Sequence, residues 1–253
     1  MEQTININNH KINFYDNQVE DKIPVVMLHG WGQDYHCFDH LINAIGDKRR
    51  VIALDLSGFG KSEEPTYPYT IYDYEEEFSQ IMNYLEINKF DLIAHSFGGR
   101  ISIIYQTNHP GKINRLVLTG AAGIKPKKTL RNKIAAYHYK FMKLLTKTPL
   151  FCQFRQDLLK NSGSEDYRNA SDMMKKVLVN TVNEDLVELI SNIDVKTLLY
   201  WGAEDDATPL KDAYKFASLI KDNELEIIPN QGHFAFLFNY QDFNKKVLKF
   251  LKI

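Results

Sequence analysis

The order of apolar runs along this 253-residue chain limits its fold more than any other feature. Short apolar runs, most of them ending in Gly, Asp or Ser, are typical of buried strands. They cover residues 24–30, 51–55, 91–96, 115–120, 197–202 and 225–229. The segments between them place apolar residues three and four positions apart, as in helices packed on a sheet. They cover residues 72–86, 99–108, 211–220 and 238–251. This alternation predicts an α/β fold with a mostly parallel central sheet flanked by helices.

Two segments ahead of these runs have a different pattern. Residues 4–8 and 11–15 alternate apolar with polar side chains. A period of two with one polar face is typical of antiparallel strands that are solvated on one side. We therefore expect the sheet to be mixed at one edge.

One long segment interrupts the alternation. Residues 121–191 show amphipathic helical patterns without a convincing strand. They predict an inserted all-helical cap, or lid, which leaves 1–120 and 192–253 as the α/β core. The segment holds thirteen Lys and Arg against seven Asp and Glu. Either a solvated basic helical face or a field that attracts anionic substrates would explain this excess.

Composition excludes several classes of protein. A formal charge of -1 argues against general nucleic-acid binding, which usually needs a basic excess. Cys37 and Cys152 stand apart, without a CxxC or Cys/His cluster, so we expect no metal site and no cofactor. The first residues show no signal-peptide pattern, and nowhere do eighteen apolar residues follow one another. These features predict a cytoplasmic protein without a membrane span.

The sharpest local motif is Ala94-His-Ser-Phe-Gly-Gly, which follows one apolar run and precedes a helical segment. Strand, sharp turn and helix form the context of a nucleophile elbow, in which the Ser has a strained backbone. Small residues two positions before and after the Ser leave space for the crossing backbone, and Ala94 and Gly98 stand there. Ala94 departs from the stricter Gly-x-Ser-x-Gly form by one methyl group. Ser96 is therefore a candidate nucleophile.

Five motifs, taken in order, resemble those of the α/β-hydrolase family. They are His29-Gly-Trp-Gly, Asp55-Leu-Ser-Gly-Phe-Gly-Lys-Ser, Ala94-His-Ser-Phe-Gly-Gly, Gly202-Ala-Glu-Asp and Gly232-His. The resemblance covers nearly the whole chain outside the predicted cap. It implies an α/β-hydrolase fold and a serine hydrolase whose nucleophile, acid and base follow one another in that order.

A serine hydroxyl needs an imidazole to accept its proton and a carboxylate to hold that imidazole in the right tautomer. His233 follows Gly232, after the last apolar run and before the last helix, where the family carries its catalytic His. The other His residues lack this context. His29 is expected to shape the oxyanion loop, and His95 to line the site or to pack beneath it.

Three neighbouring carboxylates could supply the acid. The family pattern is Gly, two residues, Asp, three residues and Pro, and Asp205 has Gly202 and Pro209 at these spacings. Asp205 is therefore the predicted acid. Asp206 and Glu204 remain as weaker alternatives.

The resemblance also implies an oxyanion hole made by the backbone N–H groups of Trp31 and Phe97. Their side chains could equally be walls of the pocket. Arg100 matches an Arg that follows Gly-Gly in a menaquinone-pathway lyase, so it is a candidate substrate-binding residue. A structural ion pair is the alternative role for Arg100.

The segment Asp55-Leu-Ser-Gly-Phe-Gly-Lys-Ser contains Gly-Lys-Ser after an apolar run, as a phosphate-binding loop does. Such a loop needs a Gly five places before the Gly-Lys pair and a helix after it. The chain has Asp55 at the first place and Glu63-Glu-Pro at the second. We therefore interpret the segment as a structural turn without a nucleotide.

A Ser in the elbow disfavours the branches of the family that use Asp, the haloalkane dehalogenases and epoxide hydrolases. The leading hypothesis is hydrolysis of a small-molecule carboxylic ester through an acyl-enzyme. Carbon–carbon bond hydrolysis, a lyase of the menaquinone-pathway type, and cofactor-free perhydrolysis are alternatives on the same fold. A receptor that binds a small ligand without turnover is an alternative of a different class.

Overall fold

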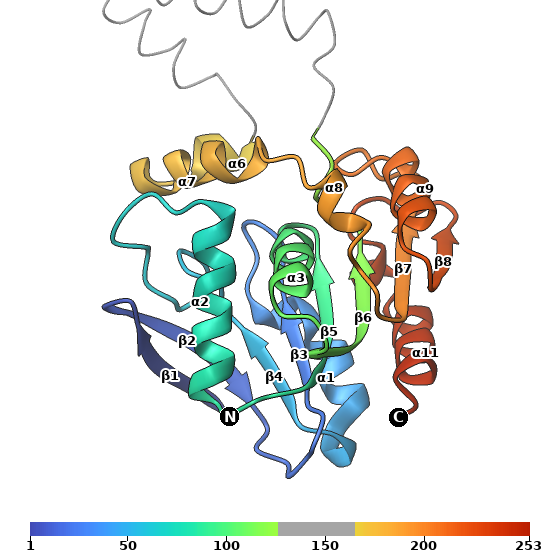
Figure 1. The fold of residues 1–253 in the computed structure, drawn as a ribbon, viewed down its shortest axis with the longest axis horizontal. Helices are drawn as coiled ribbons and strands as arrows, with labels where there is room; N and C mark the ends of the chain where they lie inside the picture. The colour runs from blue at the N-terminus through green and yellow to red at the C-terminus, as the bar shows by residue number, and fades with distance from the viewer. Residues whose placement is uncertain (126–164) are drawn as a thin grey trace, which may run out of the picture.

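A computed structural model describes residues 1–125 and 165–253 of the chain. Eight strands form one sheet in the order β1-β2-β4-β3-β5-β6-β7-β8 (Figure 1). They are β1 (Glu2–Ile7), β2 (His10–Asp16), β3 (Val25–Leu28), β4 (Val51–Leu54), β5 (Phe90–His95), β6 (Ile113–Thr119), β7 (Thr197–Gly202) and β8 (Asn223–Ile228). The six strands from β3 to β8 pair in parallel, which confirms the predicted α/β fold.

The first two strands form the predicted mixed edge. β1 pairs antiparallel with β2, and β2 pairs antiparallel with β4. In β1 the apolar Ile5 and Ile7 are buried while the alternating Thr4 and Asn6 are exposed, as the period of two predicts. By contrast, every residue of β3, β4 and β5 is buried, because helices cover both faces of the central sheet.

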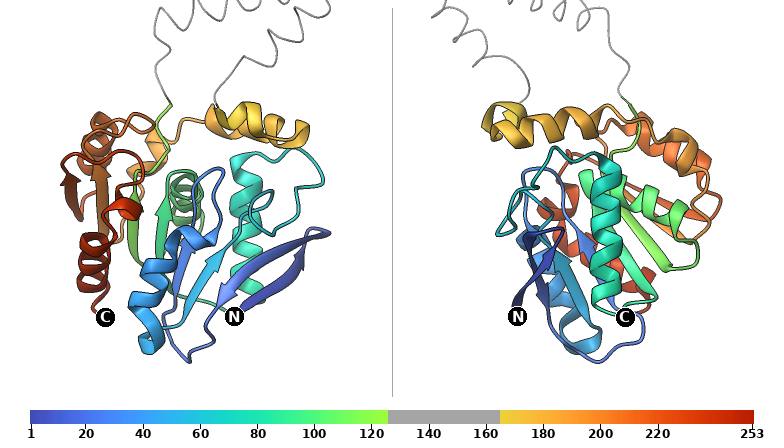
Figure 2. Two further views of the ribbon diagram at one scale, coloured as in Figure 1. Left: turned by 180° about the vertical axis from the view of Figure 1, so that it is seen from behind. Right: turned by 60° about the vertical axis from the view of Figure 1, so that its left-hand side comes forward.

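Helices pack against both faces of the sheet (Figure 2). One layer contains α2 (Ile71–Tyr84), α3 (Phe97–Asn108), α8 (Val187–Ile190) and α9 (Leu210–Leu219). The other contains α1 (Asp39–Ile45), α10 (Ala235–Phe238) and α11 (Tyr240–Leu251). Short 3-10 turns at Tyr35–Phe38 and Gly46–Lys48 flank α1. Two apolar cores result, one on each side of the sheet.

The ends of the predicted helices agree with the structure within a few residues. The helix predicted over 238–251 begins at Tyr240, because Asn239 has φ -113° and ψ 42° and separates it from α10. The beginning of α2 is fixed by a capping box, in which Thr70 and Asp73 each accept the other's backbone N–H.

Within residues 165–191, the predicted cap is mostly helical. It contains α6 (Glu165–Asn169), α7 (Asp172–Val182) and α8. In Figure 1, α6 and α7 lie beyond the carboxyl ends of the parallel strands. The rest of the predicted cap, residues 126–164, lies outside the described residues. No helix in residues 1–125 or 165–253 combines the length and apolar character needed to cross a membrane.

Candidate active site

Ser96 lies at a strained turn between β5 and α3. Its backbone has φ 46° and ψ -104°, a conformation that is costly for any residue other than Gly. Two backbone hydrogen bonds hold the turn: the Ser96 N–H donates to Thr119 O at 3.1 Å, and Ser96 O accepts from the Ala122 N–H at 2.9 Å. The strand, turn and helix expected of a nucleophile elbow are therefore present.

Close contacts explain why small residues follow the serine. A Cβ atom at Gly98 would lie 2.5 Å from the carbonyl oxygen of Leu28, at the end of the neighbouring strand β3. A Cβ atom at Gly99 would lie 2.7 Å from the Cβ of Ala121. Leu28 and Ala121 thus exclude a side chain at these two positions, and the Gly98 N–H donates to His29 O at 3.1 Å.

Three predicted site residues meet at the carboxyl edge of the sheet. His233 Nε2 lies 2.9 Å from Ser96 Oγ, and His233 Nδ1 lies 2.9 Å from Asp205 Oδ2. The Asp205 side chain is completely buried, and that of His233 is 13% exposed. Because the ionised carboxylate only accepts hydrogen bonds, it holds the proton on Nδ1 and leaves Nε2 free to accept one. The arrangement can transfer a proton from the Ser96 hydroxyl to the imidazole.

Only one of the three neighbouring carboxylates contacts His233. Asp205 Oδ1 accepts the backbone N–H groups of Ala207 at 3.0 Å and Thr208 at 2.8 Å. Asp206 and Glu204 are exposed. The spacing of Gly202, Asp205 and Pro209 therefore predicted the carboxylate that contacts the imidazole in the structure.

Thr208 belongs to the same cluster, although the sequence motifs did not predict it. Its hydroxyl lies 2.8 Å from Asp205 Oδ2, 3.1 Å from Gly120 O and 3.4 Å from His233 Nδ1. It therefore fixes the carboxylate at the oxygen that holds the imidazole. A Thr three residues after an Asp in a turn is a local signal for such a bond, and it could have been read from the sequence.

His95 packs beneath the site and does not line its cavity. The residue is 1% exposed, and Nδ1 hydrogen-bonds to Thr119 O at 2.9 Å. Its ring centroid lies 4.8 Å from that of His233 and 4.4 Å from that of Phe236. Burial, reinforced by the nearby His233, lowers the pKa of His95 well below the usual value. A neutral ring therefore supports one side of the His233 imidazole.

His29 shapes the loop that follows β3. Nδ1 hydrogen-bonds to Gly30 O at 2.7 Å, and Nε2 accepts the Leu56 N–H at 2.9 Å. Burial lowers the pKa of His29, so the neutral ring can donate at one nitrogen and accept at the other. This bridge fixes the loop of Trp31 against the turn that follows β4.

The Asp55 carboxylate fills the turn that resembled a phosphate loop. It accepts the backbone N–H groups of Tyr35 at 2.9 Å and Lys61 at 2.9 Å, and the Asn13 amide at 2.8 Å. An acidic side chain thus occupies the place where a phosphate loop would present donors to its ligand. The turn has a structural role.

Trp31 and Phe97 lie in the cavity wall near the serine. Both line its cavity, and their rings make an edge-to-face contact with centroids 5.4 Å apart. Among the protein acceptors in the described segments, none accepts the backbone N–H of Trp31 or of Phe97. Two backbone donors beside Ser96 are thus available to a ligand.

A cavity of about 190 Å³ opens on Ser96. Its described lining is mostly apolar, with Arg100, Asp166, Thr208 and Asp212 as the polar members besides the serine. The apolar and small residues are Trp31, Phe97, Ala122, Gly123, Ile124, Leu178, Val182 and Ala207. The wall therefore combines residues of the elbow, of α7 and of the loop that carries Asp205.

Arg100 connects the elbow helix to the chain that leaves α7. Its guanidinium donates to the carbonyl oxygens of Glu184 at 2.9 Å and Val182 at 3.4 Å. Burial lowers the pKa of Arg100 to about 10, so it remains charged at neutral pH. Arg100 therefore pairs with backbone carbonyl oxygens and not with the carboxylate that a structural ion pair would need. A guanidinium carries five N–H donors, so Arg100 has further donors for a ligand.

A family model described as the alpha/beta hydrolase fold matches residues 23–240. The chain is 30% identical over 251 residues to 2-hydroxy-6-oxo-6-(2'-aminophenyl)hexa-2,4-dienoic acid hydrolase of Metapseudomonas resinovorans. This alignment covers 90% of this chain and 83% of that protein. The chain is 26% identical over 248 residues to the AB hydrolase superfamily protein YisY of Bacillus subtilis (strain 168), with 90% and 91% covered.

Solved structures show the same architecture. The esterase EaEST from Exiguobacterium antarcticum superposes with a TM-score of 0.78 at 23% identity, over 100% of both chains. A serine hydrolase involved in carbazole degradation, CarC, gives a TM-score of 0.73 at 25% identity, over 100% of this chain and 98% of that one. Together with the match over residues 23–240, these likenesses show that the chain belongs to the α/β-hydrolase family.

Proposed function

We propose that this α/β-hydrolase cleaves a small carboxylic ester through an acyl-enzyme formed on Ser96. One observation carries the proposal: Ser96 Oγ, the His233 ring and the Asp205 carboxylate form a continuous chain of 2.9 Å contacts. This chain ends at the floor of a cavity large enough for a small acyl group. A serine activated by a neighbouring base is the arrangement that acyl transfer requires.

In the first half of the reaction, Ser96 Oγ attacks the ester carbonyl carbon while its proton moves to His233 Nε2. Asp205 stabilises the imidazolium that forms. The tetrahedral intermediate then expels the alcohol, which takes the proton from Nε2. In the second half, a water molecule replaces the alcohol, attacks the acyl carbon with the same base, and releases the acid and Ser96.

The negative charge on the carbonyl oxygen needs donors that are already in place. We assign this oxyanion hole to the backbone N–H groups of Trp31 and Phe97. The support is that both groups belong to cavity-lining residues and have no protein acceptor among the described residues. The strained elbow and the His29 bridge fix the two donors before substrate arrives.

We assign residues 121–191 to a cap that covers the site, with 1–120 and 192–253 as the core. Leu178 and Val182 of α7 line the cavity that opens on Ser96. Arg100 holds the end of α7 by two carbonyl oxygens. These contacts support a lid that limits which acyl groups reach the serine.

Carbon–carbon bond hydrolysis is the second candidate, and two observations favour it. Several relatives are named as hydrolases of 2-hydroxy-6-oxo dienoates or of 2-hydroxymuconate semialdehyde. None of these named substrates is an ester. The cavity also holds the buried, charged Arg100, which could pair with the carboxylate of such a substrate. The same nucleophile and base would serve both reactions.

Parallel assays separate the candidates. The protein is mixed with p-nitrophenyl butyrate, with a 2-hydroxy-6-oxo-hexa-2,4-dienoate, and with a fluorophosphonate probe. Ester turnover with little dienoate cleavage supports an esterase, whereas the opposite preference supports carbon–carbon hydrolysis. Labelling of Ser96 without turnover of either substrate would instead indicate a receptor.

The Arg100→Met variant distinguishes ester hydrolysis from carbon–carbon bond hydrolysis in a second way. It should reduce cleavage of the dienoate, which carries a carboxylate, by about tenfold or more relative to cleavage of the neutral ester. Equal losses for both substrates would mean that Arg100 acts only by holding α7.

A further inference from the structure

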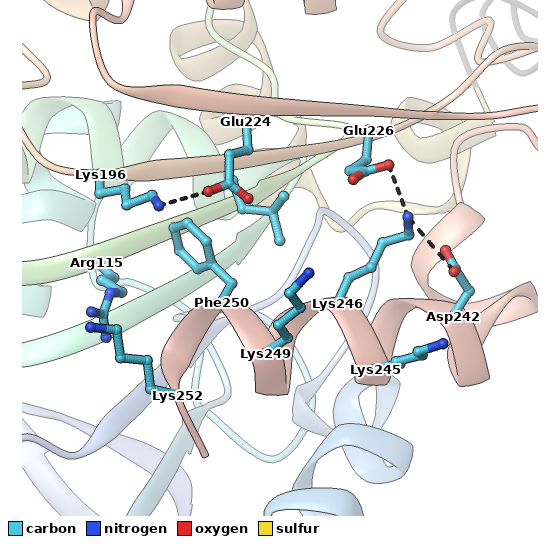
Figure 3. A pocket seen from close by; sticks show the side chains of 11 residues that line it. Arg115, Lys196, Glu224, Glu226, Asp242, Lys245, Lys246, Lys249, Phe250 and Lys252 are labelled. Atoms are coloured by element: carbon cyan, nitrogen blue, oxygen red, sulfur yellow. Dashed lines mark hydrogen bonds and ion pairs between the residues drawn. The ribbon is translucent and has the colours of Figure 1, made fainter.

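A second cavity, far from Ser96, lies between α11 and the outer strands of the sheet (Figure 3). It has a volume of about 350 Å³. Arg115 lies near the start of β6, Lys196 directly precedes β7, and Glu224 lies near the start of β8. The groove is therefore near the amino ends of these strands, whereas Ser96, Asp205 and His233 follow carboxyl ends.

Basic side chains outnumber acidic ones along this groove. The basic members are Arg115, Lys196, Lys245, Lys246, Lys249 and Lys252, and the acidic members are Glu224, Glu226 and Asp242. Two lysines form ion pairs with the three carboxylates, as Figure 3 shows. Lys196 Nζ lies 2.7 Å from Glu224, and Lys246 Nζ lies 2.9 Å from Glu226 and 3.8 Å from Asp242. Two lysines thus pair with the three carboxylates, and with the other four basic groups the groove has a formal charge of +3.

Four basic groups of the groove lack a carboxylate partner among the described residues. Within the described segments, no acidic group lies within ion-pair distance of Arg115, Lys245, Lys249 or Lys252. Arg115 Nη1 donates to the carbonyl oxygen of Leu251 at 3.3 Å, which fixes the guanidinium beside the end of α11. The remaining guanidinium N–H groups can donate to an anion in pairs.

Stabilisation of the helix end explains only part of this arrangement. Lysines in the last turn interact favourably with the negative end of a helix, and Lys249 lies in the last turn of α11. Lys245 lies one turn earlier, and Arg115 belongs to a strand that is far away in sequence. The convergence of cations from different elements on one hollow points to a ligand.

We propose that this groove binds a compact soluble polyphosphate group, such as a triphosphate. Phe250 and Leu198, the apolar members of the lining, are 8% and 2% exposed, so they offer little surface to an apolar ligand. A planar bilayer would meet the protruding lysines but would not reach Arg115 in the hollow. A chain of phosphates can enter it and contact Arg115, Lys249 and Lys252 together.

Isothermal titration of the full chain with sodium tripolyphosphate, at constant ionic strength, tests the proposal. The double variant Lys249→Gln/Lys252→Gln keeps most of each aliphatic stem and should weaken binding by about tenfold or more, because charge-assisted hydrogen bonds are lost. The matched control is Lys89→Gln/Lys221→Gln, which removes the same charge from exposed sites outside the groove and should bind like the parent. Arg115→Lys, which retains the charge but not the paired donors, should be intermediate.

Several outcomes would overturn the proposal. They include no binding by the parent chain, equal weakening in the two double variants, and sulfate binding as tight as that of tripolyphosphate. Vesicles containing phosphatidylserine provide the comparison with a membrane surface. If vesicles bind through Lys249 and Lys252 while tripolyphosphate does not, the basic surface serves a membrane instead. Ester hydrolysis by Ser96 is measured separately, so failure of either proposal leaves the other standing.

Discussion

At the scale of single residues, one carboxylate among three neighbours contacts the proposed base. Asp205 is buried and contacts His233, whereas Asp206 is exposed. Asp205→Asn should lower kcat by about four orders of magnitude, because the amide favours the wrong imidazole tautomer. Asp206→Asn should change kcat by less than about threefold. Steady-state assays with p-nitrophenyl butyrate measure both, and equal losses would contradict the assignment.

Thr208 is expected to position the acid without touching substrate at the reacting atoms. Thr208→Val removes a hydroxyl 2.8 Å from Asp205 Oδ2 while keeping the shape of the side chain. We expect kcat to fall by about tenfold, or about 1.4 kcal/mol, with a changed pH profile and little change in KM. Thr208→Ser should restore most of the rate. A Thr208→Val variant with parental kcat and pH profile would show that the hydroxyl has only a structural role.

At the scale of elements, the β1–β2 hairpin is tied to α2 by a buried cluster. His10 Nε2 lies 2.7 Å from Ser57 Oγ and 2.9 Å from Glu77 Oε2, and the Ser57 hydroxyl donates to Glu77 Oε1 at 2.6 Å. The hydrogen bond to Glu77 raises the pKa of His10 above its usual 6.5, against the opposing effect of burial. The protonated imidazole therefore stabilises the folded hairpin more than the neutral ring does.

The sign of the pH effect follows from this raised pKa. The contribution of the pair is complete below about pH 6.5, the unfolded pKa, and is lost as pH rises through the folded pKa. The difference in unfolding free energy between the parent and His10→Gln should therefore shrink as pH rises above 6.5. Urea unfolding at a series of pH values measures it. A difference that grows with pH would contradict the assignment of charge to His10.

The cap is expected to control which acyl groups reach the serine. Leu178 of α7 lines the cavity of about 190 Å³. Leu178→Phe should reduce that volume and shift preference towards shorter p-nitrophenyl esters by about tenfold, while labelling by a small fluorophosphonate changes little. Val179→Phe is the matched control, because Val179 lies on the same helix but is 49% exposed. An unchanged chain-length profile in a folded Leu178→Phe variant would exclude α7 as part of the lid.

For the whole molecule, the fold was predictable because each strand and helix has a local pattern. The burial of β3, β4 and β5 at every position matches their continuous apolar runs, and the mixed edge follows from the alternation in β1. The meeting of Ser96, His233 and Asp205 was predictable, because motif and fold coincide at these residues.

Other features depend on contacts between distant segments and had no local signal. The carbonyl partners of Arg100 lie more than eighty residues away, at Val182 and Glu184. The basic groove needs Arg115 of β6 to meet the lysines of α11, which periodicity within either element does not predict. Such sites can be recognised only when the order of the strands in the sheet is known.

The central claim is that Ser96 is a nucleophile that forms a covalent acyl-enzyme, and mass spectrometry of the intact protein tests it most directly. The parent chain is quenched in acid during turnover of p-nitrophenyl butyrate, and a second sample is treated with a fluorophosphonate. We predict adducts of one acyl and one phosphonyl group, both mapped to Ser96. Ser96→Ala should carry neither and should lose about four orders of magnitude in kcat while remaining folded. Parental turnover by Ser96→Ala, or an adduct at another residue, would contradict the account.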